Sequence, residues 1–297
     1  MVTPEGAYRT VDDASDPELM WGLRGGGGNF GVVTEFRFRT HRCGPRVVAG
    51  FVVYHLDEGA RVLGRLAEFA AGAPDEVTTV TFLRLAPPVP WMPAATVGQP
   101  VVMVGAVYAG PVEEGLVALR PLRRLGAPLV DALAPRPFLE HQTVIDAANP
   151  AGHRYYWKSA YVAGLGDGLI DLVVEQAAGL SSPLSLIGLF QLGGAAARGG
   201  DRSCLPTRQA AFLVDYASHW VEPREDDQHI TWTRTAMERI APYGLGAGYA
   251  NFEADGAAPT RHAFPPDSHR RLVALKNAHD PTNTLHLNAN IAPSPPQ

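Results

Sequence analysis

A run of four glycines near the N-terminus is the first stretch whose composition could support chemistry. It lies in Leu-Arg-Gly-Gly-Gly-Gly-Asn-Phe-Gly, residues 23–31. Because glycine has no Cβ, the backbone N–H groups of such a run can approach a bound group closely. The spacing Gly26-x-Gly28-x-x-Gly31 also has the letters of a dinucleotide-binding fingerprint, in which the loop and a helix N-terminus hold a pyrophosphate.

The order of the flanking elements excludes that fingerprint. It needs a strand before the glycines and a helix after them. Here residues 15–18, Ser-Asp-Pro-Glu, predict a helix start before the glycines, with a polar cap and an early proline. Residues 32–39 are β-branched and aromatic with alternating arginines, which predicts a strand after them. A Rossmann-type site is therefore rejected.

Polar and aromatic side chains also alternate along the apolar strand predicted at 154–162. Tyr156 and Lys158 share one face of it, and Tyr155 and Trp157 share the other. An aromatic face would suit a ring-shaped substrate, and a packed core stripe is an equal alternative for Tyr155 and Trp157. Lys158 is one of only two lysines in the chain. Because an unpaired buried ammonium is costly, Lys158 requires a carboxylate, a substrate or water beside it.

Several function classes lack support. The net charge is −5 with no lysine or arginine cluster, which argues against nucleic acid and an anionic membrane surface as partners. No apolar run has the length of a membrane span. The ten histidines show no metal-ligand spacing, so no metal is predicted, and the serine-hydrolase and P-loop motifs are absent. Cys43 and Cys204 form no CxxC pair and indicate a reducing compartment, hence a cytoplasmic protein.

The elements that would position these residues are strands and helices in mixed order. Strands are predicted at 47–54, 77–85, 100–108, 154–162, 185–192 and 210–220, and helices at 57–71, 112–124, 167–178, 222–240 and 266–278. Because few of them follow a βαβ order, the sequence predicts an α+β fold with a large antiparallel or mixed sheet covered by helices. The proline-rich residues 86–98 predict a loop or flap.

Five stretches, in order, resemble the flavin-binding family of vanillyl-alcohol-oxidase and berberine-bridge-enzyme type. They are residues 23–31, 154–159 (Arg-Tyr-Tyr-Trp-Lys-Ser), 191–198, 249–252 (Tyr-Ala-Asn-Phe) and a tail, 279–293, that ends in Asn-x-Asn-Ile-x-Pro. The resemblance covers essentially the whole chain. It implies a substrate-domain sheet joined to the remnant of an α+β FAD-binding domain.

The resemblance implies an FAD-dependent oxidase or dehydrogenase of a small-molecule alcohol or amine, such as a sugar or secondary metabolite. Hydride would pass to flavin N5 while a base removes a proton, and O2 would reoxidise the flavin. Tyr249 is the first choice for the base. Its partner is Tyr216 or Asp215, because strand alternation puts these two on opposite faces. Gln191, Tyr156 and Lys158 are the predicted substrate contacts.

The residues expected to bind FAD lie in the glycine stretch, in the 249–252 motif and in the tail. They are Gly26, Gly27, Gly28, Asn29, Gly31, Val32, Asn251, Asn288 and Asn290. Relatives also have a long N-terminal half with the phosphate-binding loop, and residues 1–44 contain no counterpart of it. Without those N–H donors FAD should bind poorly. Missing strands would also leave apolar surface and open edges near residues 25–38.

The predicted organisation has three parts. Residues 1–44 are the C-terminal remnant of an FAD-binding domain, 45–252 the substrate-binding domain, and 253–297 a segment returning to the flavin domain. Three interpretations follow: a truncated oxidase of bacterial type, a flavin-free binding module or cyclase/isomerase, and a subunit completed by a separate FAD-domain chain or by its own homodimer.

Overall fold

The computed structural model describes residues 1–41, 43–198, 200–205, 209–253, 263–287 and 289–295. The strands are β1 Arg46–His55, β2 Val77–Leu85, β3 Pro100–Tyr108, β4 Val130–Asp131, β5 Ala134–Pro137, β6 Arg154–Val162, β7 Leu186–Gln191 and β8 Phe212–Trp220. The α-helices are α1 Pro17–Leu23, α2 Gly59–Ala71, α3 Val112–Ala118, α4 Phe138–Gln142, α5 Asp167–Ala178, α6 Asp226–Ile240 and α7 Pro266–His279. The short 3₁₀ helices are η1 Gly27–Asn29, η2 Leu56–Glu58, η3 Arg120–Arg124, η4 Asp146–Ala148, η5 Gly194–Ala197, η6 Gly200–Arg202, η8 Pro223–Glu225, η9 Ala241–Tyr243 and η10 Ala250–Phe252.

All eight strands belong to one antiparallel sheet. Their order is β4-β1-β3-β2-β7-β8-β6, and β5 also pairs with β1. The register aligns Phe82, Gly188, Asp215 and Ser159 in one row across β2, β7, β8 and β6. Aligned residues of antiparallel strands point to the same face, so this row shares one side of the sheet. The expected α+β fold with a large antiparallel sheet is confirmed.

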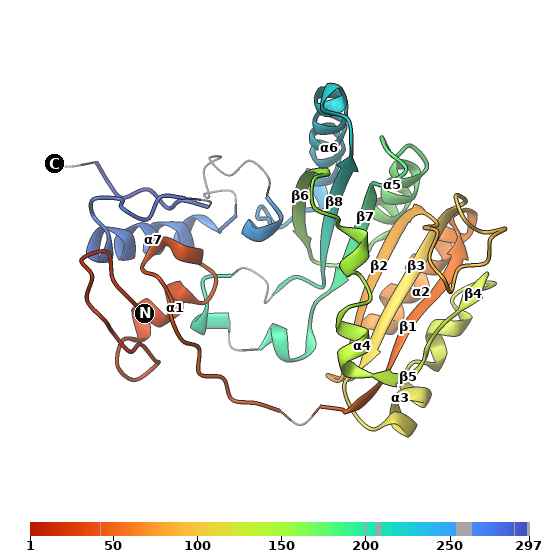
Figure 1. The fold of residues 1–297 in the computed structure, drawn as a ribbon, viewed down its shortest axis with the longest axis horizontal. Coiled ribbons are helices and arrows are strands. Elements are labelled where there is room, and N and C mark those ends of the chain that lie inside the picture. Colours follow the sequence, from red (N-terminus) through yellow and green to blue (C-terminus); the bar gives the residue numbers. More distant parts are fainter. Residues whose placement is uncertain (42, 199, 206–208, 254–262, 288, 296–297) are drawn as a thin grey trace.

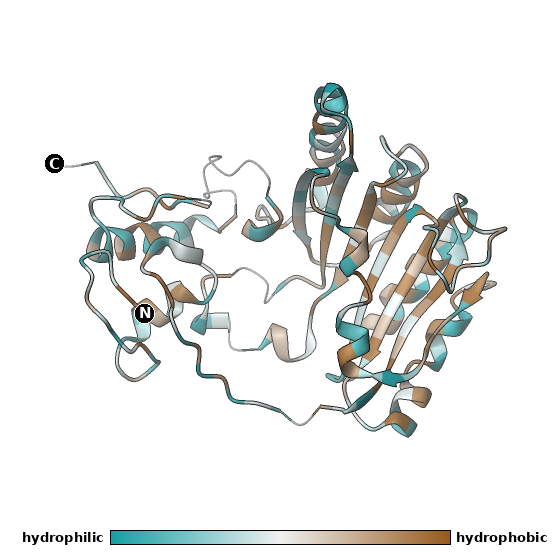
Figure 2. Cartoon of the chain, viewed as in Figure 1, coloured by the Kyte–Doolittle hydropathy of each residue, from teal (hydrophilic) through white to brown (hydrophobic). Residues whose placement is uncertain are grey.

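Helices α2, α5 and α6 pack on one face of the sheet (Figure 1). Leu63 and Leu66 of α2, Val173 of α5 and Ile240 of α6 are fully buried there. These side chains form one large core with the apolar strand residues, which appear brown along the sheet in Figure 2. We call this side the covered face, and the opposite side, which carries Phe82, Gly188 and Asp215, the open face.

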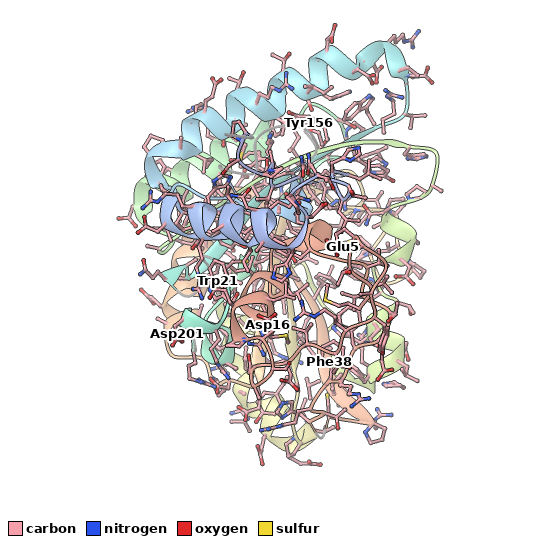
Figure 3. All side chains as sticks on the ribbon, turned by 90° about the vertical axis from the view of Figure 1, so that its left-hand side faces the viewer. Glu5, Asp16, Trp21, Phe38, Tyr156 and Asp201 are labelled. Atoms are coloured by element: carbon pink, nitrogen blue, oxygen red, sulfur yellow. The ribbon has the colours of Figure 1, made fainter. Side chains whose placement is uncertain are left out.

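Both ends of the chain meet in a second, smaller core beside α1 and α7 (Figure 1). Its buried hydrophobic members are Met1, Leu19, Trp21, Phe30, Cys204, Ala263, Phe264, Leu272, Leu275 and Ile291. Figure 3 views the molecule from this end, where the Arg271 guanidinium lies 3.8 Å from the ring centre of Trp21. The segment before α1 and the tail after α7 are therefore packed together, and Cys204 joins them from the middle of the chain. The predicted boundaries at 44 and 252 stay a prediction.

Two predicted elements differ from the structure. Residues 32–39 form no strand, and Val32 alone of them makes a bridge, to Val2. The alternating pattern is suited to a sheet, but among the described residues no neighbouring strand accompanies it, so Phe36 and Phe38 stack on each other in the open. The helix predicted at 112–124 divides into α3 and η3. Pro121 explains the division, because it cannot donate an N–H inside a continuing helix.

Candidate functional site

The open face of the sheet is lined with aromatic rings that are partly buried, except for Phe51, which is buried. They come from strands β1, β2, β6 and β7 and from two flanking segments, and the members are Phe51, Phe82, Trp91, Tyr155, Trp157, Phe190, Tyr249 and Phe252. Neighbouring rings touch along the whole series, with centres 5.1–6.4 Å apart. The sequence had located Tyr155 and Trp157 on one face of β6, and the structure assigns them to this aromatic surface.

Asp215 is the acidic group on this face. It is 3% exposed, and its Oδ1 has no hydrogen-bond partner among the residues that the structure describes. Burial, and secondarily the negative charge of Glu253, raises the pKa of Asp215 well above its usual range. A neutral carboxyl with one free oxygen can donate or accept a proton at the sheet surface.

Tyr249 reaches the same region from a segment that runs along the edge of β6. Residues 244–247 bond the backbone of Tyr161 and Val162, and the N–H of Tyr249 donates to Ser159 Oγ at 2.9 Å. The amide of Asn251 donates to the Tyr249 hydroxyl oxygen at 2.9 Å. Because Ser159 is aligned with Asp215 across the strand pair, Tyr249 and Asp215 lie on either side of one serine.

Tyr216 is not part of this group. It points to the covered face, is fully buried, and donates from its hydroxyl to Gln176 of α5. Burial raises its pKa far above the ordinary value for a tyrosine. As a partner of Tyr249 the residue was wrongly chosen, since the sheet separates the two rings. Asp215, the alternative that strand alternation had left open, is the one on the open face.

The predicted substrate contacts Gln191, Tyr156 and Lys158 also lie away from the open face. Gln191 accepts a hydrogen bond from Thr79 at 2.7 Å, and Arg234 of α6 donates to the Tyr156 hydroxyl at 2.9 Å. Figure 3 labels Tyr156 next to α6. These positions contradict direct contact with a ligand on the open face. Of the partners that the sequence left open for Lys158, the structure shows a carboxylate, with Nζ 2.8 Å from Glu253 Oε2.

Glu253 and Ser159 are site residues that the sequence interpretation missed. Glu253 accepts the backbone N–H of Ser159 at 3.1 Å in addition to the Lys158 ammonium. A side chain at Gly248 would approach the Ser159 carbonyl within 2.6 Å and Glu253 within 2.8 Å, so this glycine permits the close docking. The signal available in the sequence was the required partner of Lys158, but nothing marked which carboxylate it was.

Most of the glycine stretch is occupied by contacts within the chain. A Cβ at Gly26 would lie 2.5 Å from the Gly22 carbonyl oxygen, and one at Gly31 would lie 2.1 Å from Met1. Asn29 donates to the carbonyl oxygens of Gly26 and Ala289 and accepts the N–H of Ile291. The backbone of Val32 pairs with Val2. The Asn29 amide and the Val32 backbone therefore make their hydrogen bonds within the chain, which contradicts a main role of these groups in holding FAD.

Gly27 and Gly28 remain as positions where the backbone is open. Gly28 would meet nothing within 4 Å if it carried a Cβ, and Gly27 has a φ of +67° with one distant neighbour. This pair fits one close contact with FAD. Of the predicted tail residues, Asn288 lies outside the described residues, and Asn290 follows Ala289, whose carbonyl binds Asn29. Asn251 is committed to the Tyr249 hydroxyl.

The described part of the chain contains no group of three His, Cys, Asp or Glu side chains that could hold a metal ion. None of its helices is both long and apolar enough to span a membrane.

Sequence comparison finds related proteins but no matching family model. A FAD-linked oxidoreductase of Dictyostelium discoideum is 26% identical over 298 residues, which cover 99% of this chain and 62% of that protein. The FAD-linked oxidoreductase aurO of Gibberella zeae is 28% identical over 291 residues, covering 93% and 54%. The chain therefore spans less than two thirds of the length of these curated relatives.

Solved structures share the fold. 6-Hydroxy-D-nicotine oxidase from Arthrobacter nicotinovorans superposes with a TM-score of 0.81 at 21% identity, over 99% of this chain and 65% of that one. The berberine-bridge-enzyme-like protein 28 of Arabidopsis thaliana gives 0.80 at 18% identity, over 99% and 66%. In sequence, the chain is thus similar to proteins named FAD-linked oxidoreductases. In fold, it is similar to 6-hydroxy-D-nicotine oxidase and to a berberine-bridge-enzyme-like protein.

Proposed function

We propose that the chain serves FAD-dependent oxidation of a small-molecule alcohol or amine on the open face of the sheet. The observation that supports this most is the placement of Asp215 and Tyr249 on either side of Ser159. Both groups exchange protons, and both lie among aromatic rings that favour a flat substrate. The chain's relatives are named FAD-linked oxidoreductases, which supports the same class of reaction.

The described residues would perform the proton transfer and the positioning. Bound FAD would supply the hydride acceptor at N5 and pass the electrons on to O2. Tyr249 is the proposed base for the substrate hydroxyl or amine proton, because the Asn251 amide donates to its oxygen and so positions the hydroxyl. Asp215 is the proposed proton partner, because burial raises its pKa and so favours the neutral carboxyl. Gly27 and Gly28 are the proposed backbone contacts to the cofactor.

The test is to titrate the purified chain with FAD and follow the visible spectrum and flavin fluorescence. We expect weak but saturable binding, and peroxide formation with an oxidisable alcohol or amine in the same preparation. Gly28→Val should weaken FAD binding by about 10-fold, because a side chain there would separate the backbone from the cofactor. Gly64→Val on α2 is the matched control, since Gly64 also has open space around it. If the chain leaves the visible spectrum and the fluorescence of added FAD unchanged, the result would instead support a flavin-free binding module or isomerase.

A partner that completes the flavin site is the second part of this proposal. Phe36 and Phe38 are 68% and 78% exposed on an extended, unpaired segment. Such a segment can add to the edge of another sheet. We propose that a separate FAD-domain chain or a second copy of this chain covers it. Native mass measurement with and without FAD distinguishes a dimer from a monomer.

A further inference from the structure

Arg84 of β2 is a charged side chain on the open face that the proposed proton transfer does not use. The register aligns it with Val101 of β3 on one side and with Leu186 and Ala217 of β7 and β8 on the other. It is half-buried, while its neighbour Leu83 on the covered face is fully buried. The Arg84 side chain therefore extends from β2 on the same side of the sheet as the aromatic rings.

The guanidinium of Arg84 has few partners. Its Nε donates to the carbonyl oxygen of Leu85 at 3.2 Å, and within the described part of the chain no carboxylate forms an ion pair with it. Burial lowers the pKa of Arg84, and the Arg84 charge contributes, after burial and His153, to lowering the pKa of His219 to about 4. Because a guanidinium has five N–H donors, most of those on Arg84 are available to a ligand.

An unpaired, partly desolvated cation is unfavourable for folding alone. Retaining an unpaired charge at a half-buried position costs free energy unless an anion pairs with it. Replacement of Arg84 by an apolar side chain should consequently leave the fold as stable as before, or more stable. This expectation separates a ligand-binding arginine from a structural one.

The surroundings indicate what kind of anion fits. Phe82, two residues before Arg84 on the same face of β2, contacts Phe190 with ring centres 6.4 Å apart, so flat apolar surface lies on the same face as Arg84. From the usual strand spacing and rise, the Cα atoms of Arg84 and Asp215 are about 12 Å apart. The neighbouring charge that affects the pKa of Asp215 is that of Glu253. An anion bound to Arg84 would therefore be held apart from the proton-transfer group.

We propose that Arg84 binds a carboxylate of the substrate, which makes the substrate a flat, carboxylate-bearing alcohol or amine. This inference rests on the proposed oxidation at the same face. A carboxylate suits the site because its two oxygens match the parallel N–H groups of a guanidinium. The oxidised carbon would lie toward Asp215 and Tyr249, with the acid group at the opposite end of the molecule.

The test uses two probes that differ only in charge, 4-(hydroxymethyl)benzoate and 4-(hydroxymethyl)benzamide. Binding to the full chain without added FAD is measured by calorimetry and by thermal shift. We expect the benzoate to bind the unaltered chain and the benzamide to bind much more weakly. Arg84→Met should weaken benzoate binding on the order of 10- to 100-fold, with no fall in its own melting temperature.

Arg61→Met is the matched control, because Arg61 on α2 pairs with Glu58 on the other side of the sheet and its loss changes the net charge equally. Equal binding of the two probes, absence of benzoate binding to the unaltered chain, or unchanged binding by Arg84→Met would each overturn the proposal. So would a lowered melting temperature of Arg84→Met, which would identify a structural arginine. Since no FAD is added, these outcomes are independent of whether the flavin titration succeeds.

Discussion

At the scale of single residues, Asp215 determines what the open face can do. Its carboxyl is buried with one oxygen unpartnered among the described residues, and Glu253 adds a negative charge nearby. The protonated form is therefore favoured in the folded chain. Ionisation would place an uncompensated charge at the sheet surface, so the residue links proton transfer to folding stability.

The pH dependence of this link has a definite sign. The pKa of Asp215 is raised on folding, so its stabilising contribution is complete below the unfolded value, about 3.9. That contribution is lost as pH rises from there through the raised folded value. Asp215→Asn cannot ionise, so the excess of its melting temperature over that of the unaltered chain should grow as pH rises from about 4 towards the raised folded pKa and stay constant above it. Thermal melts over that range measure the difference.

Asp171→Asn is the control for that experiment. Asp171 is exposed on α5, so its replacement should give a nearly constant difference in melting temperature. A constant difference for Asp215→Asn as well would contradict the burial argument.

At the scale of elements, the sequence predicted strand alternation correctly but could not decide which face of the sheet the helices cover. The sequence showed that Tyr156 and Lys158 oppose Tyr155 and Trp157, and that Asp215 opposes Tyr216, and the register confirms both. Both faces carry aromatic residues, so composition could not show which one receives α5 and α6. That choice depends on contacts such as Tyr216 with Gln176, between residues 40 positions apart.

The edge of β6 illustrates a further limit of local pattern. Residues 244–253 have neither helical nor strand periodicity, yet they dock through backbone bonds to Tyr161 and through Glu253 to Ser159. Residues 32–39 show the reverse case, because their pattern is typical of a strand but only Val32 pairs. An alternating pattern determines which side chains share a face, but the segment becomes a β-strand only when a neighbouring strand pairs with it.

Glu253 should determine how firmly the Tyr249 segment stays on β6. Glu253→Ala removes the acceptor of the Ser159 N–H and leaves Lys158 without this carboxylate. Loss of a hydrogen bond to a charged group corresponds to about 1.5–3 kcal/mol, so the Ser159 amide should exchange about 10- to 100-fold faster. Hydrogen exchange measured by NMR reports this directly. The Tyr161 amide, which bonds the Ala247 carbonyl, should change less.

Glu175→Ala is the matched control, since Glu175 forms an exposed ion pair with Arg239 on the helix side. It should leave the Ser159 amide unchanged. Unaltered exchange in Glu253→Ala would show that the backbone bonds alone hold the segment.

At the scale of the whole molecule, extended connections join the large core beneath the sheet to the small core at the chain ends (Figure 1). The large core depends on the sheet and its helices. The small one depends on both chain ends, which Asn29 joins through its bonds to Ala289 and Ile291. The resemblance of residues 23–31 and 279–293 to one family indicated that both belong to the same unit, but composition gave no reason for their contact.

Lys276 is the charge at the centre of the small core, and its removal should unfold that core selectively. Lys276 and Asp280 are both fully buried, with Nζ 2.6 Å from Oδ2, and Nζ also donates to the carbonyl oxygens of Asn29 and Leu285. Lys276→Met leaves the Asp280 charge buried without its partner, which typically costs about 3–5 kcal/mol. We therefore expect early proteolytic cleavage near α7 while the sheet core still melts at its former temperature. Arg270→Met, which breaks only the exposed pair with Asp267 on the same helix, should cost less than about 1 kcal/mol and leave α7 protected. A single cooperative melt that shifts as a whole in Lys276→Met would show instead that the two cores fold as one unit.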